Sequence, residues 1–179
     1  MPGSGTAVAR AAVMGATYAA MHAAHQVADH WVQTDHQATH KGAPGREGAR
    51  ACASHVAAYT ATSTAAVVAT HRALGLPVSW RAVLAGQAVS AVTHYWADRR
   101  TPLRRLAERI GRGRLYALGQ PREGRDDNPT LGTGAYALDQ SWHIGWIAVG
   151  ALVTALLSGR RRGRGFRRSG GVNDSLTCR

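Results

Sequence analysis

The chain has 179 residues, enough for one domain, and carries a formal net charge of +12 at pH 7. Cys52 and Cys178 lie too far apart for a disulfide framework or a zinc ribbon, and we expect Cys52 to be a small buried residue on a helix. The positive charge favours an anionic neighbour: nucleic acid, an acidic membrane surface or a phosphorylated substrate. With one Phe, five Trp and five Tyr, and no helix-turn-helix or zinc-finger pattern, we expect no specific nucleic-acid binding.

Four segments are long, poor in charge and free of proline: 6–33, 50–71, 79–98 and 133–158. Each is close to the roughly 20 residues that span a bilayer. Only the fourth is plainly hydrophobic, and the mean hydropathy of −0.22 would also suit a soluble helical bundle. The second and third segments nevertheless lack the charged face of a soluble amphipathic helix. We therefore predict an all-α fold: an up-down-up-down four-helix transmembrane bundle in a bacterial inner membrane, with membrane lipid as its partner.

The connections between these segments differ in length and charge. Residues 34–50 are predicted to form a loop, and 74–77 a tight turn. Residues 99–132 hold nine arginines, and within them Thr101 is the expected N-cap of a short helix, with Pro102 at its first position. One face of this helix is apolar and the rest is basic, which suits either an anionic lipid surface or a solvated helix. The apolar residues are Leu103, Leu106 and Ile110.

The helical domain is expected to cover residues 1–158. The tail, residues 159–179, is basic and is predicted to be disordered.

Three of the seven aspartates lie inside the apolar segments, and each has a histidine four residues away. Residues at this spacing share one face of a helix. In addition, His55 is the sole ionisable side chain between Arg50 and His71 of the second segment. The pairs are His25 with Asp29, His94 with Asp98, and His143 with Asp139.

Alternating helix directions would bring all of these groups to the same end of the bundle. Histidine and carboxylate on facing helices form a ligand set for Zn, Mn or Fe. The candidates outnumber the ligands of one tetrahedral site, so either two metals bind or some groups act as supporting residues or as acid and base. The candidate ligands are His25, Asp29, His55, His94, Asp98, Asp139 and His143.

Other polar residues are assigned supporting roles. Gln33 and Gln140 could orient a ligand or water, or could equally form hydrogen bonds between helices. Lys41 is the only lysine and is expected to hold an anionic substrate. The remaining histidines are expected to be solvated or supporting: His22, His30, His36, His40 and His71.

Together these motifs resemble those of a known family. The pattern H-x3-D-x3-Q-T from His25 to Thr34, followed by Lys41, His55, H-x3-D at 94–98 and LDQSWH at 138–143, is similar to the small membrane proteins of bacteria and phages grouped as domain of unknown function 3307. The resemblance covers most of residues 15–157. It implies a polytopic membrane protein and supplies no established reaction. By the style of its site alone, the chain also resembles the membrane-bound metal-dependent hydrolases of bacteria.

Three functions follow from these expectations. The leading hypothesis is a metal-dependent hydrolase that acts on an anionic, phosphoester-like substrate, with Asp29 or Asp139 as general base. The alternative is a non-enzymatic membrane protein, which transports metal ions or protons or uses the same groups as a structural polar network. A basic nucleic-acid-binding protein is the third hypothesis. The orientation stays open, because basic residues are nearly balanced between the two ends, twelve against ten.

Overall fold

The computed structural model describes residues 4–122, 124 and 132–158, and in this part of the chain it contains helices and turns but no strand. The predicted all-α class is therefore confirmed. The long helices are α1 (Ser4–Val27), α3 (Gly45–Ala73), α4 (Trp80–Asp98) and α7 (Gly134–Ser158). The short elements are the π-helix η1 (Ala28–Val32) and the helices α2 (Asp35–His40), α5 (Thr101–Arg109) and α6 (Gly113–Ala117).

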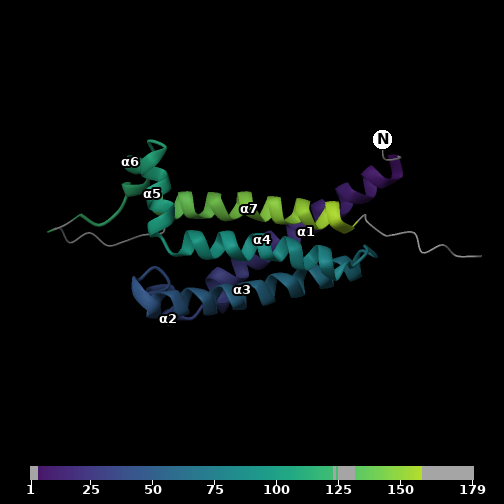
Figure 1. Ribbon diagram of the computed structural model, residues 1–179, viewed down its shortest axis with the longest axis horizontal. Coiled ribbons are helices and arrows are strands. Elements are labelled where there is room, and N and C mark those ends of the chain that lie inside the picture. The colour runs from purple at the N-terminus through teal and green to yellow at the C-terminus, as the bar shows by residue number, and fades with distance from the viewer. Residues whose placement is uncertain (1–3, 123, 125–131, 159–179) are drawn as a thin grey trace, which may run out of the picture.

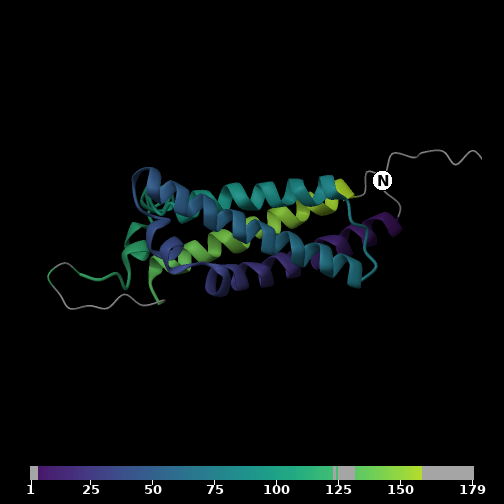
Figure 2. The ribbon, with the colours of Figure 1, turned by 90° about the horizontal axis from the view of Figure 1, so that it is seen from below.

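The four long helices pack as neighbours around a common axis. Both α1 and α4 contact α3 and α7. Successive long helices run in opposite directions, so the end of α1, the start of α3, the end of α4 and the start of α7 lie together (Figures 1 and 2). The same end carries α2, α5 and α6, and we call it the site end.

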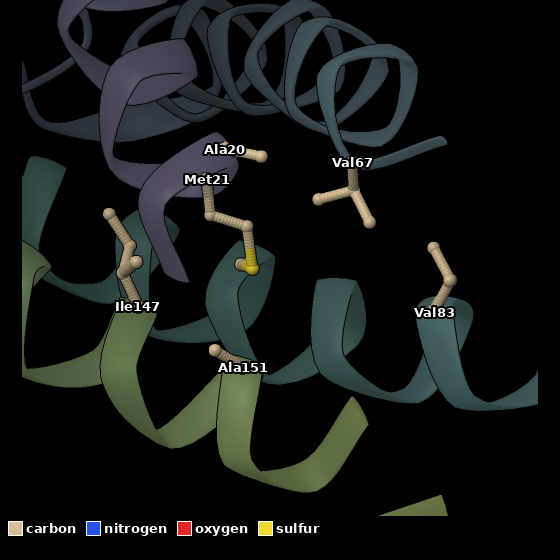
Figure 3. Packing of buried hydrophobic residues seen from close by; sticks show 6 residues of the cluster. All are labelled: Ala20, Met21, Val67, Val83, Ile147 and Ala151. Carbon is tan, nitrogen blue, oxygen red and sulfur yellow. The ribbon is translucent and has the colours of Figure 1, made fainter. Parts of the chain in front are cut away.

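The long helices pack around an apolar cluster (Figure 3). Close approach of α4 and α7 depends on two facing glycines, Gly86 and Gly150. A Cβ atom added to Gly86 would lie 2.5 Å from the carbonyl oxygen of Gly150, and one added to Gly150 would lie 2.8 Å from that of Gly86. The core residues are Ala20, Met21, Val67, Val83, Ile147 and Ala151.

The prediction that residues 34–50 form a loop is wrong, because α2 lies within this range and α3 begins at Gly45. A capping box starts α2: the backbone N–H of Gln37 donates to Thr34 Oγ1 (3.2 Å), and the N–H of Thr34 donates to Gln37 Oε1 (3.0 Å). This reciprocal pair satisfies two backbone donors that a helix start otherwise leaves unpaired.

The expected basic amphipathic helix exists as α5, with Leu103 and an alanine buried on its inner face. Its N-cap was predicted one residue too late, because Arg100 is the cap and Thr101 is the first helical residue. Arg100 has φ of 57°, a left-handed conformation that is unusual for a residue other than glycine. This conformation turns the chain sharply from α4 into α5. Ile110 lies beyond the helix and is 63 % exposed, contrary to the prediction that it shares the apolar face.

His71 was expected to be either solvated or supporting, and Cys52 was expected to be buried. His71 has the supporting role: it is fully buried, with Nε2 2.9 Å from Thr17 Oγ1 and Nδ1 3.1 Å from the carbonyl oxygen of Pro77. Cys52 is fully buried on α3, as expected.

The predicted disordered tail lies outside the described residues. Among the described helices, α7 is the one whose length and apolar composition suit a membrane span.

Candidate metal centre

The seven histidine and aspartate residues predicted as ligands come together at the site end. Their local positions follow from helix geometry, because a residue and the one four positions later lie on the same face. His25 closes α1, and Asp29 lies in η1 directly after it. The other ligand candidates lie on α3 (His55), α4 (His94 and Asp98) and α7 (Asp139 and His143).

Four of these side chains direct one atom each toward a common point, which we call the inner centre. The Nε2 atom of His55 lies 3.5 Å from Asp29 Oδ1, 3.3 Å from Asp98 Oδ2 and 3.0 Å from His94 Nε2. The Nε2 atom of His94 lies 3.8 Å from Asp29 Oδ1 and 3.1 Å from Asp98 Oδ2. All four side chains are buried or nearly so.

These separations match the ligand shell of one small metal ion. Bonds of roughly 2.0–2.2 Å from a tetrahedral metal to nitrogen and oxygen place neighbouring ligand atoms about 3.3–3.6 Å apart. The five separations given above, 3.0–3.8 Å, bracket that range. Two imidazoles and two carboxylates are also a suitable donor set for Zn, Mn or Fe.

A second group of ligand candidates lies beside the inner centre, toward α1 and α7. The rings of His25 and His143 have centroids 4.8 Å apart, and the ring of His143 lies 4.2 Å from that of His94. His25 Nε2 lies 3.5 Å from Asp29 Oδ2, the carboxylate oxygen that faces away from His55. One ligand atom each from His25, His94 and His143 lies within 4.8 Å of the others, and the same holds for Asp98, Asp139 and His143.

Several of these buried atoms have no hydrogen-bond partner, although buried polar atoms are nearly always paired. They are both ring nitrogens of His25, Nδ1 of His94, Oδ1 of Asp29, Oδ2 of Asp98 and Nε2 of His143. Leaving such groups unpaired costs about 1–3 kcal/mol each. A bound cation would satisfy one nitrogen of each histidine together with the two carboxylate oxygens.

Lys41 contributes to the site mainly through Asp98. Its Nζ lies 3.0 Å from Asp98 Oδ1 and donates to Gln33 Oε1 at 2.9 Å. Asp98 thus has one oxygen held by Lys41 and the other free to face the inner centre. Residue Gln33 helps to place Lys41, which fits the supporting role expected for it.

Arg99 fixes the loop that carries Lys41, and sequence reasoning missed it. Its guanidinium donates to the carbonyl oxygens of Lys41 (2.8 Å) and Ala43 (2.7 Å). Its partners are backbone atoms more than fifty positions away, so no local pattern could have revealed this contact.

Tyr59 was also missed, although its position four residues after His55 places it on the same face. Its ring stacks on His94 with centroids 4.2 Å apart, and its hydroxyl lies 2.6 Å from Ser90 Oγ. The tyrosine therefore restrains the imidazole of His94.

Gln140, which is expected to support the site, accepts a hydrogen bond from Gln26 Nε2 and donates one to Asp139 Oδ2, each at 3.5 Å.

The π-helical turn η1 places Asp29 where α1 ends. The N–H of Gln33 donates to the carbonyl oxygen of Ala28 at 2.9 Å, the spacing of a π-helix. Such turns are rare in proteins, and those that occur often lie at functional sites. Here the turn carries the carboxylate whose two oxygens face different histidines.

An open cleft of about 610 Å³ lies beside the aspartates of the candidate metal centre. Asp29, Asp98 and Asp139 line it together with Arg100 and Arg104, and the side chain of Arg104 is much more exposed than those of Asp29 and Asp98. The centre is thus accessible to a small solute, and the outer wall of the cleft is basic. Its neutral lining includes Gln33, Gln120, Gln140, Tyr116 and Tyr136.

One of these lining groups suits the binding of an anion, and another is an accessible carboxylate. Burial raises the pKa of Tyr116, so its hydroxyl stays protonated and can donate a hydrogen bond. Asp139 has a side chain that is 26 % exposed, the most accessible of the three aspartates in the cleft.

Comparison of the chain with protein-family models, with curated proteins and with solved structures finds no match. The function is therefore inferred from the site itself.

Proposed function

We propose that this protein is a polytopic membrane protein whose inner centre binds one divalent metal ion and hydrolyses an anionic, phosphoester-like substrate. The observation that carries the proposal is the inner centre itself. Three helical segments supply Asp29, His55, His94 and Asp98, and their ligand atoms are spaced as a metal requires. The open cleft beside two of these carboxylates gives a substrate access to the ion.

A metal at this position would lower the pKa of a bound water and so supply a nucleophile at neutral pH. The residues of the chain account for the other requirements of hydrolysis. Asp139 lies in the cleft with an accessible carboxylate and is the proposed general base. Asp29 is assigned to metal binding instead, because its carboxylate is nearly buried between histidines.

The outer cleft supplies the cations for the substrate. Lys41 is paired with Asp98, so most of its charge balances the metal ligands. Arg100 and Arg104 line the cleft farther out and can contact phosphate oxygens. A small phosphoester would therefore lie with its phosphorus near the metal and its remaining part toward α5.

The distribution of apolar and charged residues supports a membrane location. Between Arg50 and Arg72, α3 has no Asp, Glu, Lys or Arg, and α7 has only Asp139. Large apolar side chains are exposed on the outer faces of the long helices, among them Leu84, Val92 and others on α7. In water such exposure is costly, whereas in lipid it is favourable. The outward residues of α7 are Val149, Leu152 and Leu156.

The tryptophans also fit this location, because Trp is enriched at membrane–water interfaces. Trp31 is 85 % exposed at the site end, where Trp96 stacks on Trp142 with ring centroids 4.6 Å apart. Trp80 is exposed at the start of α4, at the opposite end. The family resemblance of the histidine and aspartate motifs agrees with a polytopic membrane protein.

The packed interior favours a site over a conduction pathway for ions or protons. The side chains of the core cluster pack between the long helices, together with the buried pair Ser63 and Gln87. His71, the buried titratable group at that opposite end, is held by Thr17 and by the Pro77 carbonyl. We therefore prefer hydrolysis to transport.

Fractionation, metal analysis and an activity panel test the proposal in turn. The protein is expected in salt-washed membranes, with bound Zn, Mn or Fe after purification in mild detergent. His94→Ala combined with Asp98→Ala should remove both the metal and the hydrolysis of para-nitrophenyl phosphate. Recovery from the cytosol would overturn the membrane part, and equal absence of metal from both proteins would overturn the metal part. Ion flux in liposomes without hydrolysis of any phosphoester would favour transport.

A further inference from the structure

We propose that the site is dinuclear: a second divalent ion binds between His25 and His143, and the carboxylate of Asp29 bridges it to the ion of the inner centre. This inference rests on the proposed function, because it adds an ion to the same site. Nothing in the inner centre requires His25 or His143, yet both are completely or almost completely buried there.

The two oxygens of Asp29 lie near different histidines. Oδ1 faces the inner centre, 3.5 Å from His55 Nε2 and 3.8 Å from His94 Nε2. Oδ2 faces the other way, 3.5 Å from His25 Nε2. That last separation is again the spacing of two ligands on one metal. A carboxylate with histidines on both sides is suitably placed to bind one ion through each oxygen.

His143 adopts a tautomer that leaves its Nε2 atom able to bind a metal. Its Nδ1 lies 2.8 Å from the carbonyl oxygen of Asp139, which can only accept a hydrogen bond, so Nδ1 carries the proton. Nε2 is then left with a lone pair, and it is buried without a hydrogen-bond partner. A backbone carbonyl that holds one ring nitrogen in this way is the usual support for a histidine that binds metal through the other.

His25 can supply another nitrogen ligand to the second ion. Its ring is fully buried, and neither nitrogen has a hydrogen-bond partner. The ring lies next to that of His143, with centroids 4.8 Å apart. Two lone-pair nitrogens and Asp29 Oδ2 give three protein ligands and leave a position open, as catalytic metal sites do. Asp139 borders this position from the cleft.

The balance of formal charge identifies the substrate class more closely. Three carboxylates and Lys41 together contribute −3 + 1 = −2. One divalent ion neutralises this sum, whereas two ions leave +2. A phosphate monoester dianion offsets this local charge, while Arg100 and Arg104 add further positive charge in the cleft. Two-metal sites with ions about 3.5–4 Å apart are common in phosphatases. The dinuclear site therefore favours a phosphate monoester over a diester, which carries a single charge.

Metal stoichiometry and electron paramagnetic resonance test this inference on the full-length protein in detergent. Apoprotein is reloaded with Mn²⁺ alone, and bound Mn²⁺ is counted after gel filtration. Wild-type protein should hold two ions and show the spin-coupled spectrum of bridged Mn²⁺. His143→Gln and His25→Gln should each hold one ion and show the isolated six-line spectrum.

The possible results separate the two proposals. One ion in wild-type protein, with an unchanged count in His143→Gln, would overturn the second site and leave the inner centre intact. No ion in wild-type protein would overturn both. Two ions without spin coupling would overturn the Asp29 bridge. If circular dichroism shows that both variants are unfolded, the count and spectrum of the wild-type protein alone decide.

Discussion

The Nε2 atoms of His55 and His94 face each other at 3.0 Å, although the two residues lie 39 positions apart and on different helices. Two carboxylate oxygens, from Asp29 and Asp98, lie within 3.8 Å of the same pair. A single shared proton would satisfy one imidazole–imidazole contact and leave the carboxylate oxygens without a donor. A divalent cation satisfies all four atoms at once.

Replacing His94 with alanine should abolish metal binding at the inner centre, because one of its four ligands is removed. Metal content, measured by atomic emission after purification, is expected to fall to the level of protein treated with chelator. The matched control is His71→Ala, which removes a fully buried histidine at the other end. That variant should lose stability and keep its metal, and loss of metal from both variants would mean that unfolding alone explains the effect.

Replacing Lys41 with methionine should weaken metal binding without abolishing it. The lysine holds one oxygen of Asp98, and the loss of such a supporting contact typically reduces metal affinity about 10–100-fold. Competition with a fluorescent chelator measures the affinity. Arg46→Met removes the same charge from an exposed position of α3 and should leave the affinity unchanged. Equal affinities for Lys41→Met and wild-type protein would contradict the assigned role.

Replacing Asp139 with asparagine should lower kcat and leave metal bound to the inner centre. Removal of a general base typically reduces the rate about 10²–10⁴-fold. The measurements are the kcat for para-nitrophenyl phosphate and the metal content of the same preparation. Asp35→Asn, on the exposed face of α2, provides the control. An unchanged kcat would assign the base to another group.

Replacing Arg104 with glutamine should raise KM for an anionic substrate and leave kcat nearly unchanged. The residue lines the outer cleft and has an exposed side chain, so the effect should be small, about two- to fivefold. Its neighbour Arg105 is also exposed and does not line the cleft, which makes Arg105→Gln the control. Identical KM values for the two variants would exclude a cleft contact with the substrate.

Replacing Gly86 with alanine should destabilise the protein by about 1–3 kcal/mol, because the new methyl group has no space between α4 and α7. Gly145→Ala adds the same methyl group on α7 at a position with no atom within 4 Å. There the better helix propensity of alanine should dominate and stabilise by up to about 1 kcal/mol. Thermal unfolding in detergent measures both, and equal shifts would show that the crossing tolerates a side chain.

Helix periodicity explains which parts of the site could be predicted from the sequence. The pairs His25–Asp29 and His94–Asp98 share a helix face by geometry alone, and alternating helix directions place them at one end. Long-range packing decides the rest. The contact of Arg99 with backbone atoms of a distant loop has no signature in local spacing. The spacing of Tyr59 from His55 gives its helix face but does not predict its stacking on His94.

The errors in the fold have related causes. The capping box of α2 was present in the sequence as Thr34 and Gln37, but glycine and proline farther on suggested a loop. The predicted cap of α5 is one residue too late because Arg100 adopts a left-handed conformation, which is usual for glycine and unexpected for arginine. Ile110 follows the end of α5, so its spacing from Leu103 carries no information about the helix face.

For the proposed dinuclear site, the order of the ligands along the chain sets the order in which a nascent protein could acquire its ions. Asp29, His55, His94 and Asp98 are all synthesised before α5, so three long helices suffice to assemble the first ligand shell. His143 arrives only with α7, which also brings the proposed base, Asp139. Under the proposed mechanism, a partly made chain can hold one ion but has no competent catalyst. Hydrolysis is thereby withheld until the last helix has docked.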